Sequence, residues 1–461
     1  MKVLFLNFPW FEKDGAEPMR RGVRAGSRWP MTMESHFAPD HFQFGGYMPF
    51  PVFLSSAAGW LEAVCEGDRV SGLGIRDVEV HVRDSVARGE SYASCGKYLD
   101  ELKPDWIVCE TATSAWQHDK RILRHIHQLL PEARIILCGT IASGAEAGEA
   151  AALEGVAAVV KGEYEKGVAR VILGEARGLV QHDFLSKEEM NGPNGRFKWD
   201  EGCARNYFDS NPKGQRPVQL QMWASRGCVY RCNFCSWPAS MTNNDPDGAG
   251  KRSMRYYGAS WIENYIRERQ RIMGPIGCVY FDDDTGNMWD KHTNEICDVM
   301  KRLGIPWAMM CRADRSSGAT WQRMKDSGCF GVKIGFESGS QRVVDDIVGK
   351  KLDLKEAFQT AVWLRKIGLT VHGTFMLGLP GELPEEAEMT KKYIEDLYRA
   401  GGLDTHQLSG TATISGTPLA NLKNGEHNAK YPGMFKDEKW VESLDGQKRI
   451  EAITRAIQLA P

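Results

Sequence analysis

The chain has 461 residues, 42% of them hydrophobic, which is enough to build the cores of two or three domains of ordinary size. Lysine and arginine together number 58 and aspartate and glutamate 60, so no bulk charge favours a nucleic acid or an anionic membrane as partner. The apolar run at the N-terminus is too short for a signal peptide, and no run approaches the length of a membrane span. We therefore expect a cytoplasmic globular protein that binds neither nucleic acid nor membrane.

Residues 1–175 alternate short apolar runs with helical segments, a pattern typical of a parallel sheet covered by helices on both faces. Five such units predict a doubly wound, Rossmann-like α/β domain. The expected strands are 3–7, 78–83, 106–110, 134–138 and 157–161, and the expected helices lie near 54–64, 97–102, 120–130, 145–153 and 166–173.

A long irregular stretch, residues 11–50, separates the first two expected strands. A loop of this length inside a compact domain is usually functional or disordered, and its many aromatic residues argue against disorder. We expect a lid over a ligand, with an ordinary surface excursion as the alternative.

The loops after the strands of this first domain carry small and polar residues. In a doubly wound sheet, ligands bind beyond the carboxyl ends of the strands. Thr111 and Thr113 follow the third strand, Gly139 follows the fourth and Gly162 the fifth. Glycine allows close backbone approach, and threonine can donate hydrogen bonds to phosphate or amide groups. Judged from these residues alone, the loops could bind any of many nucleotides, or no nucleotide at all. Residues 84–89, after the second strand, could simply form a turn.

Residues 176–214 lack periodicity and are rich in glycine, asparagine and proline, as expected for a linker between domains. From 215 to 420 the alternation resumes with six further units, which predict an open, partial (β/α)6 barrel. The remaining residues, 421–461, are expected to form a short helical segment. The barrel strands are expected at 217–223, 278–281, 306–311, 331–336, 371–377 and 406–412, and the helices near 261–271, 291–303, 321–325, 354–366 and 384–399.

Cys228, Cys232 and Cys235 form a CxxxCxxC triplet directly after the first strand of the expected barrel. Three thiolates can bind three irons of a [4Fe–4S] cube and leave the fourth iron free for another ligand. Structural zinc normally takes four ligands in two separated pairs, and no second pair lies nearby in the sequence. Three cysteines so close together also make a poor disulfide framework. We therefore interpret the triplet as the ligands of an iron–sulfur cluster.

Polar residues follow every strand of the expected barrel, at the end where barrels of this kind build their chemistry. Residues 282–284 follow the second strand, Arg312 the third, and Glu337 and Ser338 the fourth. The roles of individual residues stay open at this point. Glu337 and Arg312 could contact a cofactor or take part in a buried ion pair, and the aspartates could cap a helix.

Four segments together resemble the radical SAM superfamily over most of residues 215–420, and its cobalamin-dependent branch in particular. They are the cysteine triplet, 281–285 (Phe-Asp-Asp-Asp-Thr), 335–339 (Gly-Phe-Glu-Ser-Gly) and 375–382 (Phe-Met-Leu-Gly-Leu-Pro-Gly-Glu). In the first domain, the order of units and the segments 138–140 and 161–165 look like the cobalamin-binding domain that precedes many radical SAM domains.

The resemblance implies three cofactors: a [4Fe–4S] cluster, S-adenosylmethionine on its unligated iron, and cobalamin. Val86 stands where other cobalamin proteins have a cobalt-ligating histidine, and because an aliphatic side chain cannot bind cobalt, the corrinoid would have no protein ligand below it. Phe234 would pack near the adenine. The other residues that the resemblance places at cofactors are Asp283, Arg312, Glu337 and Ser338 for S-adenosylmethionine, and Asp84, Thr111, Thr113, Gly139 and Gly162 for cobalamin.

The activity that this resemblance implies is a radical methyltransferase. It would move a methyl group from methylcobalamin to an unactivated carbon, or to phosphorus, of a small-molecule substrate, with electrons from a reductant such as flavodoxin or ferredoxin. Two alternatives stay open. One is an enzyme that uses both cofactors for cyclisation or rearrangement without methyl transfer, and the other is a non-catalytic regulator that binds an iron–sulfur cluster or a corrinoid.

Overall fold

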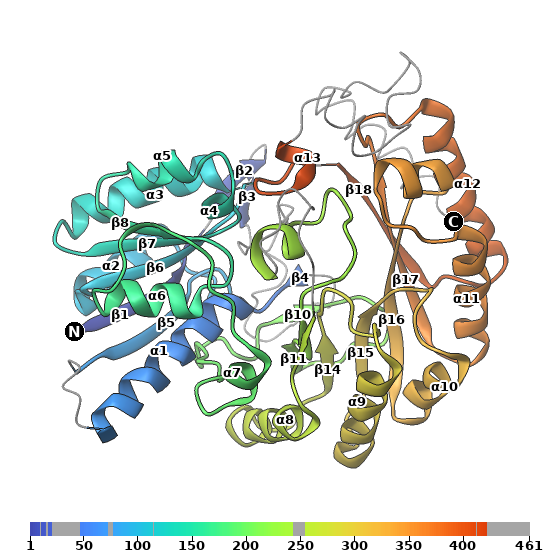
Figure 1. Ribbon diagram of the computed structural model, residues 1–461, viewed down its shortest axis with the longest axis horizontal. Helices are drawn as coiled ribbons and strands as arrows, with labels where there is room; N and C mark the ends of the chain where they lie inside the picture. The colour runs from blue at the N-terminus through green and yellow to red at the C-terminus, as the bar shows by residue number, and fades with distance from the viewer. Residues whose placement is uncertain are drawn as a thin grey trace.

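The computed structural model describes residues 1–9, 11–14, 17–20, 47–71, 77–113, 115–242, 254–411 and 413–421. Most of the expected lid at 11–50, and nearly all of the expected helical segment at 421–461, lie outside these ranges. The described residues form two halves, each built around a six-stranded parallel sheet (Figure 1).

The first sheet has the strand order β5-β1-β6-β7-β8-β9, with every neighbouring pair parallel. Alternate residues of a strand point to opposite faces, and β1 shows this directly. Val3 and Phe5 pack in the cluster that includes α1 and α6, whereas Leu4 and Leu6 pack with α2 and α3. The sheet is therefore covered on both faces, and the predicted doubly wound domain is confirmed. Its elements are β1 (Lys2–Asn7), α1 (Val52–Ser71), β5 (Glu79–Asp84), α2 (Tyr92–Leu102), β6 (Trp106–Thr111), α3 (Trp116–Leu129), β7 (Arg134–Gly139), α4 (Thr140–Ser143), α5 (Ala147–Ala151), β8 (Val156–Val160), α6 (Glu165–Ile172) and β9 (Gly178–Val180).

The segment expected as a linker, 176–214, is packed against both halves. It supplies β9, the sixth strand of the first sheet, then α7 (Lys187–Asn191) and β10 (Phe208–Asp209). β10 pairs antiparallel with β4 (Tyr47–Met48), and β2 (Phe11–Asp14) pairs antiparallel with β3 (Glu17–Arg20). The strands β9 and β10 have only three and two residues, too few to show a periodic pattern in the sequence.

The second sheet has the order β11-β14-β15-β16-β17-β18, again parallel throughout. Helices lie along its outer side (Figure 1), which confirms the predicted open, partial barrel. Its elements are β11 (Gln219–Met222), α8 (Ala259–Met273), β14 (Cys278–Phe281), α9 (Asp290–Leu303), β15 (Trp307–Cys311), α10 (Gly318–Asp326), β16 (Cys329–Glu337), α11 (Leu354–Lys366), β17 (Thr370–Leu377), α12 (Pro384–Arg399) and β18 (Thr405–Gly410). Shorter elements join them: β12 (Ser225–Arg226) paired with β13 (Arg255–Tyr256), the π-helical turns η2 (Trp237–Thr242) and η3 (Val343–Ile347), and α13 (Pro418–Asn421).

The carboxyl ends of the strands in the two halves face each other across the middle of the molecule (Figure 1). Helix α4, which follows β7, contacts η2 from the second half. The backbone N–H of Ser415 donates to the hydroxyl of Thr113, in the loop after β6, at 2.8 Å. The loops where ligands bind in each type of fold therefore meet in one place.

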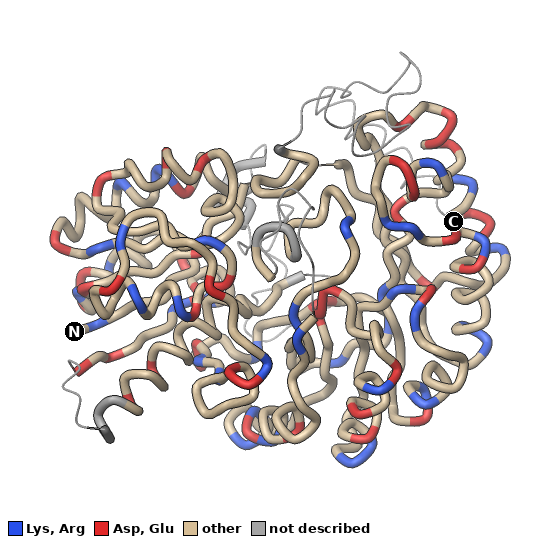
Figure 2. Tube along the Cα trace, viewed as in Figure 1, with Lys and Arg blue, Asp and Glu red and all other residues tan. Residues whose placement is uncertain are grey.

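Charged residues of both signs are interspersed along the outer helices in Figure 2, in keeping with a formal net charge of only −2. No helix in the described part of the chain has both the length and the apolar composition of a membrane span.

The close packing of the segment 196–198 on α1 gives a stability prediction. A Cβ atom at Gly59 would lie 2.2 Å from the carbonyl oxygen of Arg196, a distance that forces the backbone apart. We expect Gly59→Ala to lower the free energy of unfolding by about 1–3 kcal/mol in a urea titration. Gly67, on the same helix, has no atom within 4 Å of such a Cβ and is the matched control. Gly67→Ala should raise stability by about 0.5–1 kcal/mol, because alanine is the better helix former. Equal effects at the two positions would contradict the packing described here.

Candidate functional site

A cavity of about 540 Å³ lies at the carboxyl end of the barrel strands. All three cysteines of the triplet line it, together with residues of the β14 loop and of β15, β16, β17 and β18. The polar and charged lining includes Asp209, Ser210, Asn211, Tyr230, Asp282, Asp283, Asp284, Thr285, Arg312, Lys333, Glu337, Lys350, Thr374, Gln407 and Ser409. Polar residues that are scattered over 200 positions of the sequence are thus brought to one site.

The three cysteines lie on the loop between β12 and η2, and none of them is part of a disulfide. No group of three or more histidine, cysteine, aspartate or glutamate side chains among the described residues is placed to hold a single metal ion. A closed zinc site needs four such ligands around one ion, whereas the thiolates of a [4Fe–4S] cube each bind a different iron. All three thiols line the same cavity, as the ligands of one cluster must, and their role as cluster ligands stays a prediction.

The cysteine loop has little regular structure of its own, and Asn233 anchors it between Cys232 and Cys235. The buried Asn233 donates from its backbone N–H to the carbonyl of Val348 at 2.9 Å and from Nδ2 to that of Ile347 at 2.6 Å. Its own carbonyl accepts from the N–H of Leu419 at 3.0 Å. The turn η3 and the helix α13 thus hold the centre of the loop.

Asp283 and Asp284 hold the chain just before the first cysteine. Asp283 accepts from the N–H of Ala224 at 3.1 Å and from the hydroxyl of Ser225. Asp284 accepts from the N–H of Gly227 at 3.0 Å and from the hydroxyl of Thr242, also at 3.0 Å. Burial raises the pKa of each carboxyl to about 7. Both residues also line the cavity, so the expected cofactor contact of Asp283 stays a prediction beside this observed structural role.

Glu337 lies at a bulge where β16 pairs with β17, and its φ of 68° is unusual for a residue with a side chain. The buried carboxylate accepts from Nζ of Lys350 at 2.6 Å. A Cβ at Gly335 would lie 2.4 Å from Oε1 of Glu337 and 2.7 Å from this Nζ, so glycine is required for the pair to form. Strained backbone of this kind is concentrated at functional sites.

Arg312 packs against the cysteine loop. Its guanidinium lies 3.5 Å from the ring centre of Tyr230, which stands between Cys228 and Cys232. Asp314 accepts from Nε and Nη2 at 2.8 and 2.9 Å, and the carbonyl of Lys350 accepts from Nη2 at 3.1 Å. Burial raises the pKa of the Cys232 thiol to about 11, and the charges of Lys350 and Arg312 lower it. The two cations therefore favour negative charge at this thiol.

The remaining predicted residues of the barrel differ in position. Phe234 lines the cavity and packs against the apolar cluster that includes Ile347 and Leu379. Ser338 is fully buried behind the wall of the cavity, where its hydroxyl lies 2.9 Å from that of Thr390 and accepts from the N–H of Ser340. The structure thus brings Phe234, Asp283, Arg312 and Glu337 to the cavity and places Ser338 outside its lining.

In the first domain, neither Asp84 nor Val86 lines the cavity, and Asp84 contacts the segment 200–207. Asp84 is 1% exposed and accepts from Nδ2 of Asn7 at 2.9 Å and from the hydroxyl of Tyr207 at 3.1 Å. Burial is the main cause that raises the pKa of its carboxyl to about 6. Val86 is part of the core. The turn after β5 thus has a buried aliphatic side chain at position 86, which cannot bind a metal ion.

Thr111, Thr113 and Gly139 lie together where β6 and β7 end. The hydroxyl of Thr111 donates to the carbonyl of Cys138 at 2.8 Å, and the N–H of Thr113 donates to the hydroxyl of Thr140 at 3.2 Å. Gly139 has a φ of 98°, and a Cβ there would lie 2.0 Å from the carbonyl oxygen of Thr111. These loops form the edge of the first sheet that meets the barrel. Gly162, with a φ of 72°, begins the neighbouring loop after β8.

Four residues at this site were missed in the sequence: Lys333, Asp209, Lys350 and Tyr230. Nζ of Lys333 donates to Oδ2 of Asp209 at 2.7 Å, and both side chains are almost completely buried. The signal for Lys333 was available, because a lysine inside an apolar strand is rarely buried without a partner or a function. Lys350 gave no signal, because its Gly-Lys-Lys context is typical of a surface turn.

Comparison with known proteins identifies the second half of the chain. Residues 224–394 match the Radical SAM superfamily. The chain is similar to an uncharacterised methyltransferase of Pyrococcus horikoshii, with 25% identity over 375 residues that cover 74% of either chain. It is also similar to the cytidylyl-2-hydroxyethylphosphonate methyltransferase of Streptomyces wedmorensis, with 29% identity over 215 residues, 43% of this chain and 36% of that protein.

Two solved structures share the fold of both halves. One is the radical S-adenosylmethionine methyltransferase TsrM from Kitasatospora setae with cobalamin and a [4Fe–4S] cluster bound, at 15% identity and a TM-score of 0.57, covering 81% of this chain and 71% of TsrM. The other is the cobalamin-dependent S-adenosylmethionine radical enzyme OxsB with aqua-cobalamin and S-adenosylmethionine bound, at 14% identity and a TM-score of 0.57, covering 98% of this chain and 56% of OxsB. The resemblance to the radical SAM superfamily is confirmed over residues 224–394, and the fold class and the assignment as an enzyme are confirmed as well. The expected cofactors are those named for these two structures.

The environment of Asp84 predicts a pH dependence of stability. Its folded pKa of about 6 lies above the ordinary 3.8, so the stabilisation from the protonated carboxyl is complete below about pH 3.8 and is lost as the pH rises through about 6. Asp84→Asn removes this dependence. We expect the unfolding free energy of the wild type, relative to the variant, to fall by up to about 3 kcal/mol between pH 4 and pH 7.5. Urea titrations at the two pH values measure it, and a difference that does not change with pH would contradict the raised pKa of Asp84.

Proposed function

We propose that this protein is a cobalamin-dependent radical SAM methyltransferase that acts on a small molecule. The observation that carries the proposal is the position of three cysteine thiols on a barrel-mouth cavity that lies beside the ligand-binding edge of a doubly wound sheet. The methyltransferase names of the two sequence relatives and of TsrM support methyl transfer over other radical chemistry.

When bound, the cluster, S-adenosylmethionine and cobalamin would supply one-electron cleavage of a sulfonium and carriage of a methyl group. The chain holds and tunes these groups. Cys228, Cys232 and Cys235 would each bind one iron, and the cations of Lys350 and Arg312 would stabilise the negative charge of the thiolate-bound cluster.

Phe234, Asp283, Arg312 and Glu337 would contact S-adenosylmethionine, since all four line the same cavity as the cysteines. The rigid positions of these side chains favour this role. Asp283 is fixed by backbone N–H groups, Arg312 by Asp314 and Glu337 by Lys350. Ser338 would act indirectly, because its hydroxyl fixes the turn after Glu337 through Ser340.

The corrinoid would lie along the edge formed by Thr111, Thr113, Gly139 and Gly162. Gly139 permits the close approach of β6 and β7 at this edge, and the Thr113 hydroxyl already contacts the barrel through Ser415. Asp84 would support this edge from behind by fixing the end of β1 through Asn7. Val86 provides no lower ligand, which favours a corrinoid that is bound without a protein donor.

The substrate would occupy the deeper part of the cavity, toward the amino ends of the strands, near the Lys333–Asp209 pair, Thr374 and Gln407. Paired charges, an amide and a hydroxyl suit a polar small molecule. We propose an unactivated carbon as the methyl acceptor, with phosphorus as the alternative, and a flavodoxin or ferredoxin of the cytoplasm as the electron donor.

The first prediction of this proposal concerns the cluster. Replacing any one of Cys228, Cys232 and Cys235 by alanine should remove most of the iron after anaerobic reconstitution and abolish release of 5′-deoxyadenosine, because each thiolate binds a separate iron. Iron analysis and chromatography measure the two effects. Cys297→Ala, at a buried thiol of the outer helix α9, is the control and should retain both. Unchanged iron in the triplet variants would refute the cluster.

The second prediction concerns the product. With methyl-labelled S-adenosylmethionine and a reductant, the enzyme should yield a product that is one methylene heavier and carries the label, as seen by mass spectrometry. An unlabelled isomer or an oxidised product would instead support cyclisation or rearrangement. If reduction yields no 5′-deoxyadenosine with any substrate, the regulator hypothesis is favoured.

A further inference from the structure

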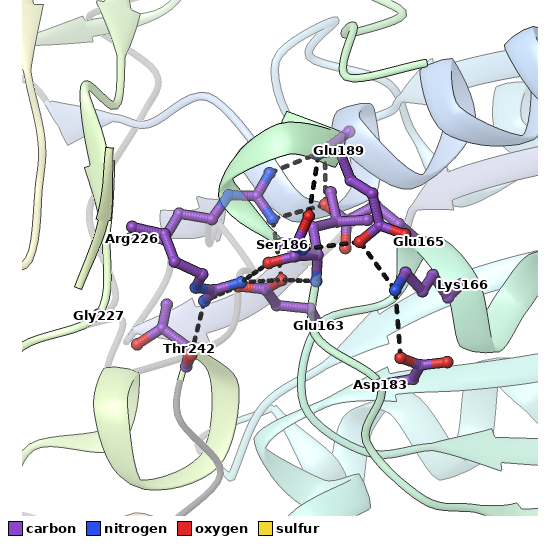
Figure 3. A network of polar contacts seen from close by, with 12 residues as sticks. Glu163, Glu165, Lys166, Asp183, Ser186, Glu189, Arg226, Gly227 and Thr242 are labelled. Atoms are coloured by element: carbon purple, nitrogen blue, oxygen red, sulfur yellow. Dashed lines mark hydrogen bonds and ion pairs between the residues drawn. The ribbon is translucent and has the colours of Figure 1, made fainter. Parts of the chain in front are cut away.

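A buried network of four charged residues joins the two halves of the molecule beside the cysteine loop (Figure 3). Glu163 lies between β8 and α6 of the first domain, and Glu165 is the first residue of α6. The other two, Arg226 and Arg255, pair across β12 and β13 of the second half. We call these four residues the interdomain network. The loop of Glu163 begins at Gly162 and belongs to the same sheet edge as Thr113 and Gly139.

Arg226 is the centre of the interdomain network and is completely buried. Its Nη1 lies 2.7 Å from Oε1 of Glu165 and 3.3 Å from Oε2 of Glu163. Its Nη2 donates to the hydroxyls of Ser56 and Tyr257 at 2.9 and 3.0 Å. One guanidinium therefore binds helix α1, the loop after β8 and the strand region of the second half at the same time.

Arg255 extends the network to the far end of the cysteine loop. It donates to both oxygens of Glu163, at 3.0 and 2.6 Å, and to the carbonyl of Thr242 at 2.8 Å. Arg226 precedes Cys228 by two positions, and Thr242 ends the turn that follows Cys235. The two glutamates of the first domain thus hold the chain, through Arg226 and Arg255, on both sides of the three cysteines.

Trp237, which also lines the cavity, makes a second link of the same kind. Its ring stacks on Phe53 of α1 with centroids 5.6 Å apart, and the guanidinium of Arg226 lies 5.2 Å from the same phenylalanine ring. Polar and aromatic contacts therefore converge on one short stretch of the domain boundary.

The network is poorly explained by stability alone. Buried ion pairs often add no more to stability than apolar side chains of the same volume, because desolvation opposes their attraction. Nε of Arg226 and Oε2 of Glu165 are buried and have no hydrogen-bond partner among the described residues, which adds a further cost. What the network does provide is a fixed geometry with directional bonds between two rigid bodies.

We infer that Arg226, Arg255, Glu163 and Glu165 are positioning residues that set the distance and orientation between the cysteine loop and the ligand-binding edge of the first domain. The inference rests on the proposed function, because it assigns the network the task of aligning the methyl donor at the cluster with the corrinoid. Misplacement of reacting groups by about 1 Å can cost about 10²-fold in rate.

Two half-reactions distinguish a loss of alignment between the two domains from a general loss of folding. Neither half-reaction needs the substrate. The first is release of 5′-deoxyadenosine from S-adenosylmethionine by the reduced cluster, which needs no group of the first half at the reacting atoms. The second is methylation of cob(I)alamin, in which the S–CH3 bond breaks, the Co–CH3 bond forms and S-adenosylhomocysteine leaves. The probes are S-adenosylmethionine and hydroxocobalamin reduced with titanium(III) citrate, added to the full chain with its cluster reconstituted.

In Glu163→Gln and Glu165→Gln, we expect iron content and 5′-deoxyadenosine release to stay within about twofold of wild type, while methylcobalamin formation falls by about tenfold or more. Arg226→Lys keeps the positive charge but loses the planar set of N–H donors of the guanidinium. We expect the same result in this variant: iron content and 5′-deoxyadenosine release near wild type, and reduced methylcobalamin formation. Lys166→Gln is the matched control. Lys166 is the next residue of α6, but its ion pairs, 3.3 Å to Asp183 and 2.8 Å to Glu189, do not reach the second half, so all readouts should match wild type.

Hydrogen–deuterium exchange tests the inference in protein that has no corrinoid bound. With the cluster alone bound, amides 225–236 should exchange at least about tenfold faster in Glu165→Gln than in Lys166→Gln, since the loop is held through Arg226. Unchanged methylcobalamin formation in the glutamate variants, or an equal loss of both half-reactions, overturns the inference. If wild type itself forms no methylcobalamin while the exchange difference is present, the network holds the loop and the proposed function fails.

Discussion

The cavity depends on one constraint: a loop that carries three thiols must be held in place although it has almost no helix or strand hydrogen bonds of its own. Asp283 and Asp284 fix its beginning through backbone N–H groups, and Asn233 fixes its centre through three backbone bonds. These side chains are almost completely buried or line the cavity wall, where unpaired polar groups are costly, so the paired arrangement is strongly preferred. The loop is rigid because its neighbours satisfy its backbone.

The same constraint explains why charged residues accumulate around this loop. Carboxylates that fix the backbone bring negative charge to the cavity, and a thiolate-bound cluster would add more. The positive charges of Lys350 and Arg312 offset this negative charge. Each cation is held in place by a carboxylate or a carbonyl, which keeps it from moving onto the thiols. The positive φ of Glu337 and the glycine at 335 are the backbone features that make room for one of these pairs.

The boundary between the two halves is part of the site. The loops at the carboxyl edge of the first sheet divide into two groups. Thr113 contacts Ser415 beyond β18, whereas Glu163 and Glu165 contact the strands on either side of the cysteine loop. The first domain therefore contacts the mouth of the barrel from two directions, and the segment 176–214, expected to be a linker, packs along α1 between the halves. Contacts of this extent favour a single relative orientation of the two domains over free movement.

The sequence by itself determined the two parallel sheets, the long helices and the cysteine triplet. Apolar periodicity acts over short distances along the chain, and the spacing of three thiols is a local property, so both can be read without coordinates. The sequence also pointed to Arg312 and Glu337, because each follows a strand whose end was recognisable. Only the tertiary structure decided which residues meet. Lys350, Lys333 and Arg226 find their partners across long loops or across the domain boundary, and no local pattern encodes such pairs. The short strands β9 and β10 likewise form because the first sheet and β4 offer unpaired edges, which is a property of the folded molecule and not of their own few residues.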